Sequence, residues 1–179
     1  PSARHLGSIF VALVLAAVCT LAVPETSPAQ WQTVETENEP TARHENAFIE
    51  AGGKFYLLGG RGDRPVNIYD PETGRWSEGP APPFQIHHFQ AVTYDGDIYV
   101  LGAWSDGFPR ENGLSHVYVY DTDADEWRQD APIPPGRRRG SAGVAVYEDR
   151  IYVVGGNVGG HGPHATAVGW LDVFDPETG

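Results

Sequence analysis

The stretch Arg150-Ile-Tyr-Val-Val-Gly-Gly156 decides the fold, because its pattern occurs three times in the chain. The other two copies are Lys54-Phe-Tyr-Leu-Leu-Gly-Gly60 and Asp97-Ile-Tyr-Val-Leu-Gly-Ala103. Aligned on Gly59, Gly102 and Gly155, the copies begin 43 and 53 residues apart. A recurrence at this period indicates a repeat architecture. Repeats specify a scaffold, so any chemistry is expected in the loops that the scaffold carries.

A second motif follows the first in each copy, an aromatic residue with a tryptophan seven positions later. Tyr69 is followed by Trp76, and Tyr120 by Trp127. Phe174 takes the aromatic position in the third copy, where the tryptophan would fall two places beyond the last residue. The three segments are therefore expected to be equivalent structural units.

Each unit is expected to form four short strands. Second strands such as 151–154 are apolar and rich in β-branched or aromatic residues, and Gly- or Asp-bearing turns precede them, as in hairpins. The fourth strand begins at the tryptophan. No window outside the N-terminus has a 3.6-residue periodicity, so almost no helix is expected. First strands are predicted near 45–49, 88–93 and 141–146, and third strands near 66–69, 117–120 and 171–174.

An apolar strand that ends in a glycine pair, followed by Tyr and Trp separated by six residues, resembles the kelch repeat. The resemblance covers roughly residues 31–179, with departures at Ala103 and Phe174. It implies an all-β fold, a kelch-type β-propeller whose four-stranded blades pack around a central channel. Three blades are expected, over about 42–83, 84–136 and 137–179, in an incomplete ring. The motif positions are Gly59, Gly60, Tyr69, Trp76, Gly102, Tyr120, Trp127, Gly155, Gly156 and Phe174.

Residues 31–41 repeat the end of a blade, because Trp31 aligns with Trp76 and Trp127. This favours a latch, in which the N-terminal strand completes the last blade of a closed ring. Propellers typically have four to eight blades. At about fifty residues per kelch blade, the chain is expected to be the front half of a six- or seven-bladed ring. The alternative is that Trp31 closes the third blade into a three-bladed object.

Residues 1–29 have the pattern of a cleaved export signal. Arg4 and His5 precede an apolar run at 9–23, and small residues precede a plausible cut at Gln30. The run is short for a membrane span, which needs about twenty residues. An uncleaved anchor and a lipoprotein attached at Cys19 are the alternatives. The signal leaves a partial propeller at 30–179, which we expect to be secreted or periplasmic.

The composition excludes several kinds of partner. The chain has 12 Lys and Arg against 24 Asp and Glu, a net charge of −12. This acidity disfavours nucleic acid, and it disfavours a membrane surface after signal cleavage. The segment 121–126 lacks the glycine that a calcium loop requires. Cys19 is the one cysteine of the chain and would be removed with the signal, so no thiolate ligand would remain. No cofactor and no metal site are therefore expected.

Candidate ligand-binding residues stand at the starts of the innermost strands, beside one mouth of the expected channel. Arginine and histidine there can bind an anionic or sugar ligand through charge-assisted hydrogen bonds. The alternative is that they cap strand ends and hydrogen-bond neighbouring blades. The candidates are Arg43, His44, His87, His88 and Arg139.

Two long loops carry further side chains of interest. His161 and His164 lie in the loop 155–169, which contains no carboxylate or cysteine to complete a metal site, so a surface loop is expected. Trp104 and Phe108 lie in the loop 103–115. Aromatic residues on loops anchor protein partners or stack on sugars when exposed. Equally, they can pack over the next blade.

The favoured interpretation is an exported, non-catalytic propeller that binds a protein or a glycan through loops around the channel mouth. The alternative is an exported kelch-fold enzyme acting on sugars, similar to sialic-acid mutarotases and less closely to galactose oxidases. No catalytic residue can be assigned from the sequence. A cytoplasmic ubiquitin-ligase adaptor, another role of proteins that this chain resembles, is disfavoured by the export pattern.

Overall fold

The computed structural model describes residues 31–179, of which 34–179 form one compact unit. The export signal predicted for 1–29 lies outside the described residues. The described part is built from antiparallel β-sheets, and its one short 3-10 helix is η1 (Pro135–Arg137). Within residues 31–179, no helix has the length and apolar character needed to cross a membrane.

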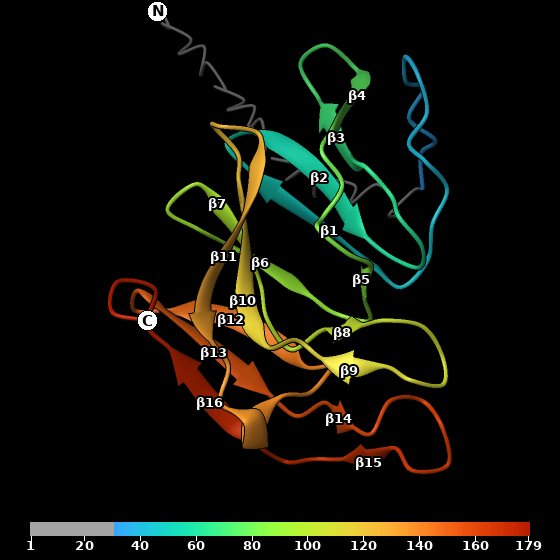
Figure 1. The fold of residues 1–179 in the computed structure, drawn as a ribbon. Helices are drawn as coiled ribbons and strands as arrows, with labels where there is room; N and C mark the ends of the chain where they lie inside the picture. The colour runs from blue at the N-terminus through green and yellow to red at the C-terminus, as the bar shows by residue number, and fades with distance from the viewer. Residues whose placement is uncertain (1–30) are drawn as a thin grey trace, which may run out of the picture. The chain divides into compact units, whose positions relative to one another are not determined.

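The first predicted blade is a four-stranded sheet in the order β1-β2-β3-β4 (Figure 1). In β3 and β4, Tyr69 lies opposite Trp76, with the ring centroids 5.1 Å apart. The spacing of the second motif is therefore that of a cross-strand aromatic pair around a tight turn. The strands are β1 (Asn46–Ala51), β2 (Lys54–Gly59), β3 (Val66–Asp70) and β4 (Arg75–Gly79).

The second blade has the order β11-β10-β7-β6, and Tyr120 lies opposite Trp127 in the same way. Its first strand begins at Ala91 rather than at the predicted residue 88. The reason is that His88 has φ +52° and donates its N–H to the carbonyl of Glu45, so it does not continue a strand. The preceding residue, His87, pairs with Trp104 in a small additional sheet of the order β5-β8-β9. The blade strands are β6 (Ala91–Tyr94), β7 (Asp97–Val100), β10 (His116–Asp121) and β11 (Glu126–Pro132), and the small sheet has β5 (Ile86–His87), β8 (Trp104–Ser105) and β9 (Asn112–Gly113).

The third blade has three strands in the described chain, in the order β12-β13-β16. A separate hairpin of β14 and β15 rises from the loop that joins β13 to β16. The prediction of an all-β chain with incomplete kelch blades is confirmed. The strands are β12 (Gly143–Tyr147), β13 (Arg150–Val154), β14 (Asn157–Val158), β15 (Thr166–Ala167) and β16 (Leu171–Phe174).

The predicted latch segment, 31–41, is not a regular strand. Residues 31–36 form no strand, and Glu37 makes an isolated parallel bridge with Arg75 of β4. The carboxylate of Glu37 also lies 3.0 Å from the Arg75 guanidinium. Closure of a last blade by this segment stays a prediction.

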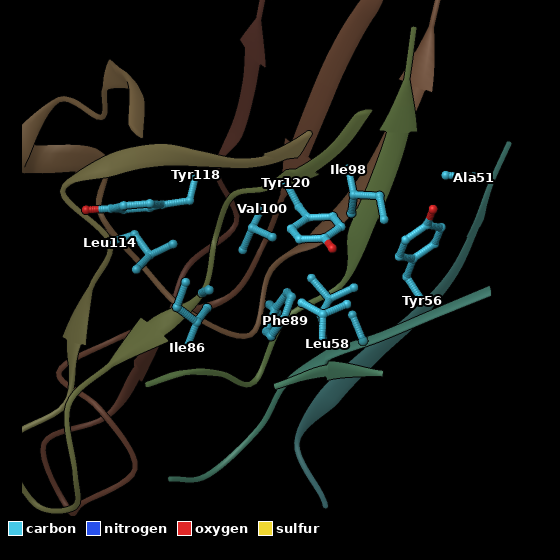
Figure 2. Close-up of a cluster of buried hydrophobic side chains, with 13 residues drawn as sticks. Ala51, Tyr56, Leu58, Ile86, Phe89, Ile98, Val100, Leu114, Tyr118 and Tyr120 are labelled. Atoms are coloured by element: carbon cyan, nitrogen blue, oxygen red, sulfur yellow. The ribbon is translucent and has the colours of Figure 1, made fainter. Parts of the chain in front are cut away.

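The core lies between neighbouring blades, and the first strand β6 runs beside both β1 and β12. Figure 2 shows Tyr56 and Leu58 of β2 facing Ile98 and Tyr120 of the second blade. A second cluster joins the second and third blades through side chains such as Val119 and Ile151. Full burial of such an aliphatic side chain is worth about 1.5–3 kcal/mol, so blade-to-blade packing is a main source of stability.

The motif glycines are required by the close approach of the next blade. Gly59 has φ +68°, and a Cβ on it would lie 2.6 Å from the carbonyl oxygen of Ile86. Gly102 has φ +58°, and a Cβ there would lie 2.6 Å from Cβ of Ala142. A larger residue would therefore be strained in its own backbone and would also push the next blade away.

Candidate functional site on the loop face

Three loops from three blades extend to the same side of the strands, toward the right of Figure 1. They are the loop 60–65 between β2 and β3, the loop 106–111 between β8 and β9, and the loop 159–165 between β14 and β15. We call the surface that they form the loop face. A network of charged and histidine side chains lies beneath it and reaches the starts of the first strands.

Glu111 connects the three loops. Its side chain is fully buried, and its carboxylate accepts a hydrogen bond from the guanidinium of Arg61 in the first blade. The same carboxylate accepts hydrogen bonds from the backbone N–H of His161, at 2.9 Å, and from its Nδ1, at 2.6 Å. Burial opposes ionisation, but the hydrogen bonds from His161 and Arg61 outweigh it and lower the pKa of Glu111 to about 2.

Arg61 extends the network to the first strand of its own blade. Its Nε donates to the carboxylate of Glu45 at 2.6 Å, while its other end holds Glu111. Burial alone would lower the pKa of Arg61, but hydrogen bonds to Glu111 and Glu45 raise it. The guanidinium is therefore a fixed positive charge between two carboxylates.

His87 and His88 meet at the carboxylate of Glu45. The Nδ1 atoms of the two histidines are 2.7 Å apart, and Nδ1 of His88 is 2.8 Å from Glu45 Oε2. Nε2 of the fully buried His87 lies 2.8 Å from the carbonyl oxygen of Asp106. Burial lowers the pKa of both histidines, that of His88 to about 4, so both imidazoles are neutral at pH 7.

The backbone at this cluster links the three blades in series. Glu45, His88 and Ser141 occupy the same position in the repeat and have φ of +61°, +52° and +56°. The N–H of His88 donates to the carbonyl of Glu45 at 2.9 Å, and the N–H of Ser141 donates to the carbonyl of His88 at 2.8 Å. The left-handed conformation therefore recurs where each blade is hydrogen-bonded to the one before it.

Two of the predicted ligand-binding residues, Arg43 and Arg139, brace their own blades. Arg139 is 4% exposed and donates to backbone carbonyls and to Asp172. These contacts match the alternative in which the residues serve blade structure, and ligand binding by them stays a prediction. Arg43 uses each of its five N–H groups, on the carbonyls of Thr41, Leu57, Gly59 and Pro65 and on Oδ1 of Asn67.

The other predicted residues are partly brought together. His87 and His88 lie side by side at Glu45, and the well-exposed His44 lies 3.4 Å from the second oxygen of that carboxylate. His161, expected in a surface loop without a carboxylate, reaches Glu111 across 50 residues of sequence. Its ring is also tilted against that of His88, with the ring centroids 3.9 Å apart. The sequence did not predict Glu45, Arg61 or Glu111 as site residues. Only the alignment of Glu45 with His88 gave a signal for any of them.

The two loop aromatics have different environments. Trp104 is 1% exposed and packs on Gly140 at the entrance to the third blade, whereas Phe108 is 65% exposed in the loop 106–111. Trp104 also lines a hollow of about 640 Å³, and its indole N–H has no partner among the described residues. A hollow of this size can hold a peptide side chain or a small ligand. Its other walls include Phe84, Asp106, Asn112, Tyr118 and Arg138.

Comparison with known proteins gives consistent matches. A family model described as the KLHDC2/KLHL20/DRC7 Kelch-repeats domain matches residues 16–178. Kelch-like protein 35 of Mus musculus is 30% identical over 145 residues, covering 78% of this chain and 23% of the mouse protein. Kelch-like protein terF of Aspergillus terreus is 30% identical over 171 residues, covering 86% of this chain and 37% of the fungal protein. The chain thus spans well under half the length of these relatives.

Proposed function

Since the chain belongs to the kelch-repeat family, we propose that it is a binding module that holds a protein partner on the loop face. The observation that carries this proposal is the buried carboxylate of Glu111, which ties Arg61 of one blade to His161 of another. Loops that are already ordered lose little conformational entropy when a partner binds. The network therefore turns three separate loops into one preorganised surface.

The exposed side chains of the loop face suit a protein partner. Phe108 is an aromatic side chain held out in solvent, of the kind that forms the anchor of many interfaces. The hollow lined by Trp104 and Tyr118 is reached from the same loop and can receive an apolar side chain of the partner. The net charge of −12 favours a partner with a basic surface, because opposite charge accelerates encounter.

The test compares two exposed aromatic residues at opposite ends of the strands. Phe108→Ala alters the loop face. Tyr147→Ala alters the last residue of β12, beside the turn to β13, and is the matched control, with 60% exposure against 65%. Proteins captured by the parent chain should be retained by Tyr147→Ala and lost by Phe108→Ala, with unchanged thermal unfolding of both variants. Equal capture by all three proteins would refute a loop-face site.

A glycan ligand is the second arm of the same experiment. The parent chain and both variants are applied to an array of immobilised glycans. The proposal expects no glycan whose binding depends on Phe108. A glycan that is bound by the parent chain and by Tyr147→Ala, but not by Phe108→Ala, would show that the ligand of the loop face is a sugar rather than a protein.

We also propose that the chain is exported, on the strength of the apolar run at 9–23 and the small residues before Gln30. The measurement is N-terminal sequencing of the protein after expression of the gene in its source cell. A mature chain that starts at Gln30 and is found outside the cytoplasm is expected. A protein that keeps residues 1–29 inside the cell would refute export.

A further inference from the structure

We propose that Glu45, His87 and His88 form a binding site for a divalent first-row metal ion of the zinc type. One carboxylate oxygen and two imidazole nitrogens of these residues converge on one point at the starts of the first two blades. The set combines ligands that zinc accepts in proteins, and three protein ligands leave a fourth position for water. The inference concerns a cation and is independent of the proposed protein partner.

The spacing of the three atoms suits a tetrahedral ion. Zinc binds imidazole nitrogen and carboxylate oxygen at about 2.0–2.2 Å, which places neighbouring ligands of a tetrahedral site about 3.3–3.5 Å apart. The separations here are 2.7 Å between the two Nδ1 atoms, 2.8 Å from His88 to Glu45 Oε2 and 3.7 Å from His87 to Glu45 Oε2. They bracket the tetrahedral value, so shifts of about half an ångström would complete the geometry.

A hydrogen bond to a residue outside the three ligands, Glu45, His87 and His88, orients the lone pair of His87 toward this point. The carbonyl oxygen of Asp106 can only accept, so Nε2 of His87 carries the proton and Nδ1 carries the lone pair. A backbone carbonyl that accepts from the second ring nitrogen is the usual support of a metal-binding histidine. His87 is also fully buried, so its ring is fixed in this orientation.

The other two ligands are compatible with a bound cation. Glu45 Oε2 accepts from Arg61 Nε at 2.6 Å, and a carboxylate oxygen has a second lone pair for the ion. Nδ1 of His88 donates its proton within the triad when no cation is bound. On binding, that proton leaves Nδ1 and one is taken up at Nε2, so His88 stays neutral and the number of bound protons does not change.

The local charge also favours a cation. One guanidinium, Arg61, lies between two carboxylates, Glu45 and Glu111, and the histidines are uncharged in the ligating form. The cluster therefore carries a net charge of −1 before the ion enters. A bound divalent cation changes the net charge of the cluster to +1, within a chain that is acidic overall. The three direct ligand bonds offset the loss of water from the ion.

The experiment titrates zinc chloride into untagged, chelator-treated protein near neutral pH, with calorimetry as the readout. One zinc ion per chain is expected. His88→Asn and Glu45→Gln should each weaken binding more than about a hundredfold, since even changes outside the direct ligands cost 10–100-fold in metal sites. His164→Asn removes a histidine from an exposed position of the loop 159–165 and should bind as the parent does.

Two further measurements keep the outcome decisive. Circular dichroism of each variant establishes that it is folded. His87 is not replaced, because it is fully buried and its replacement would disturb the fold itself. Cobalt in place of zinc should give the visible absorption of a tetrahedral ion with the parent chain and not with His88→Asn. Parent-like affinity in both His88→Asn and Glu45→Gln, or loss of binding in His161→Asn alone, would overturn the proposal.

Discussion

Replacement of Glu111 by glutamine tests the network beneath the loop face. The carboxylate is fully buried and accepts from Arg61 and twice from His161. Glutamine keeps one acceptor oxygen, but an NH₂ group replaces the other. That NH₂ group faces donors and cannot accept their hydrogen bonds. The substitution also leaves Arg61 with only one carboxylate partner, Glu45, because the second was Glu111 itself. Glu111→Gln should therefore destabilise the chain although the side chain keeps its size.

The magnitude follows from the ionisation of Glu111. Its pKa is lowered from 4.5 to about 2, which corresponds to about 3 kcal/mol of stabilisation by the ionised form. The loss of two hydrogen bonds to a charged group, at about 1.5–3 kcal/mol each, gives a figure of the same order. With a urea dependence of about 1–3 kcal/mol/M, a loss of about 3 kcal/mol should lower the unfolding midpoint by about 1–3 M.

The assay is urea unfolding followed by tryptophan fluorescence, with Glu72→Gln in the exposed turn after β3 as the matched control. Glu72→Gln should change the free energy of unfolding by less than about 0.5 kcal/mol. A folded-state pKa below the unfolded value means that this stabilisation is present above pH 4.5 and lost as the pH falls toward 2. Stability of Glu111→Gln within about 0.5 kcal/mol of the parent, or identical pH dependence of both below pH 4.5, would refute the reasoning.

Two further predictions concern Arg43 and His88. The ammonium group of lysine cannot reproduce the five hydrogen bonds that the planar guanidinium of Arg43 makes. Arg43→Lys should therefore lower the free energy of unfolding in urea by about 2–3 kcal/mol and leave partner capture unchanged. Lost capture with unchanged stability would instead support ligand binding by Arg43. Burial holds the folded-state pKa of His88 at about 4, below the ordinary 6.5, so the unfolded chain is protonated first. The free energy of unfolding should fall by up to about 3 kcal/mol as the pH is lowered from 6.5 to 4. This dependence on pH should be weaker in His88→Asn, and an equal dependence in the two proteins would contradict the prediction.

The fold could be predicted because its determinants are local and repeated. The strand pattern, the glycine that ends the second strand and the aromatic residue of the third strand can be read within one copy, and all three recur in each of the three copies. The start of β6 could not be predicted in this way. It depends on the left-handed backbone of His88, whose N–H is hydrogen-bonded to Glu45 in the first blade rather than to a strand of its own blade.

Only part of the candidate site could be predicted from the sequence, because its contacts join residues that are far apart in the chain. His87 and His88 attracted attention as neighbours, and His161 was noticed in a loop without a carboxylate. Its carboxylate comes from Glu111, 50 residues earlier in another blade. No periodicity places these two loops together, since each is an insertion of its own length between repeated strands.

The second blade differs from its neighbours at the position that matters for both proposals. Arg43 and Arg139 brace the first and third blades, but Ile86 stands at the equivalent position and has no guanidinium to offer. There the chain continues as β5, pairs with β8 and buries His87 beneath the loop 106–111. The same pairing carries Glu111 toward Arg61 and His161. The third blade has an equivalent bridge between Gly140 and Asn157 and its own hairpin of β14 and β15. The inserted hairpins of the second and third blades thus gather the ionisable side chains of three blades.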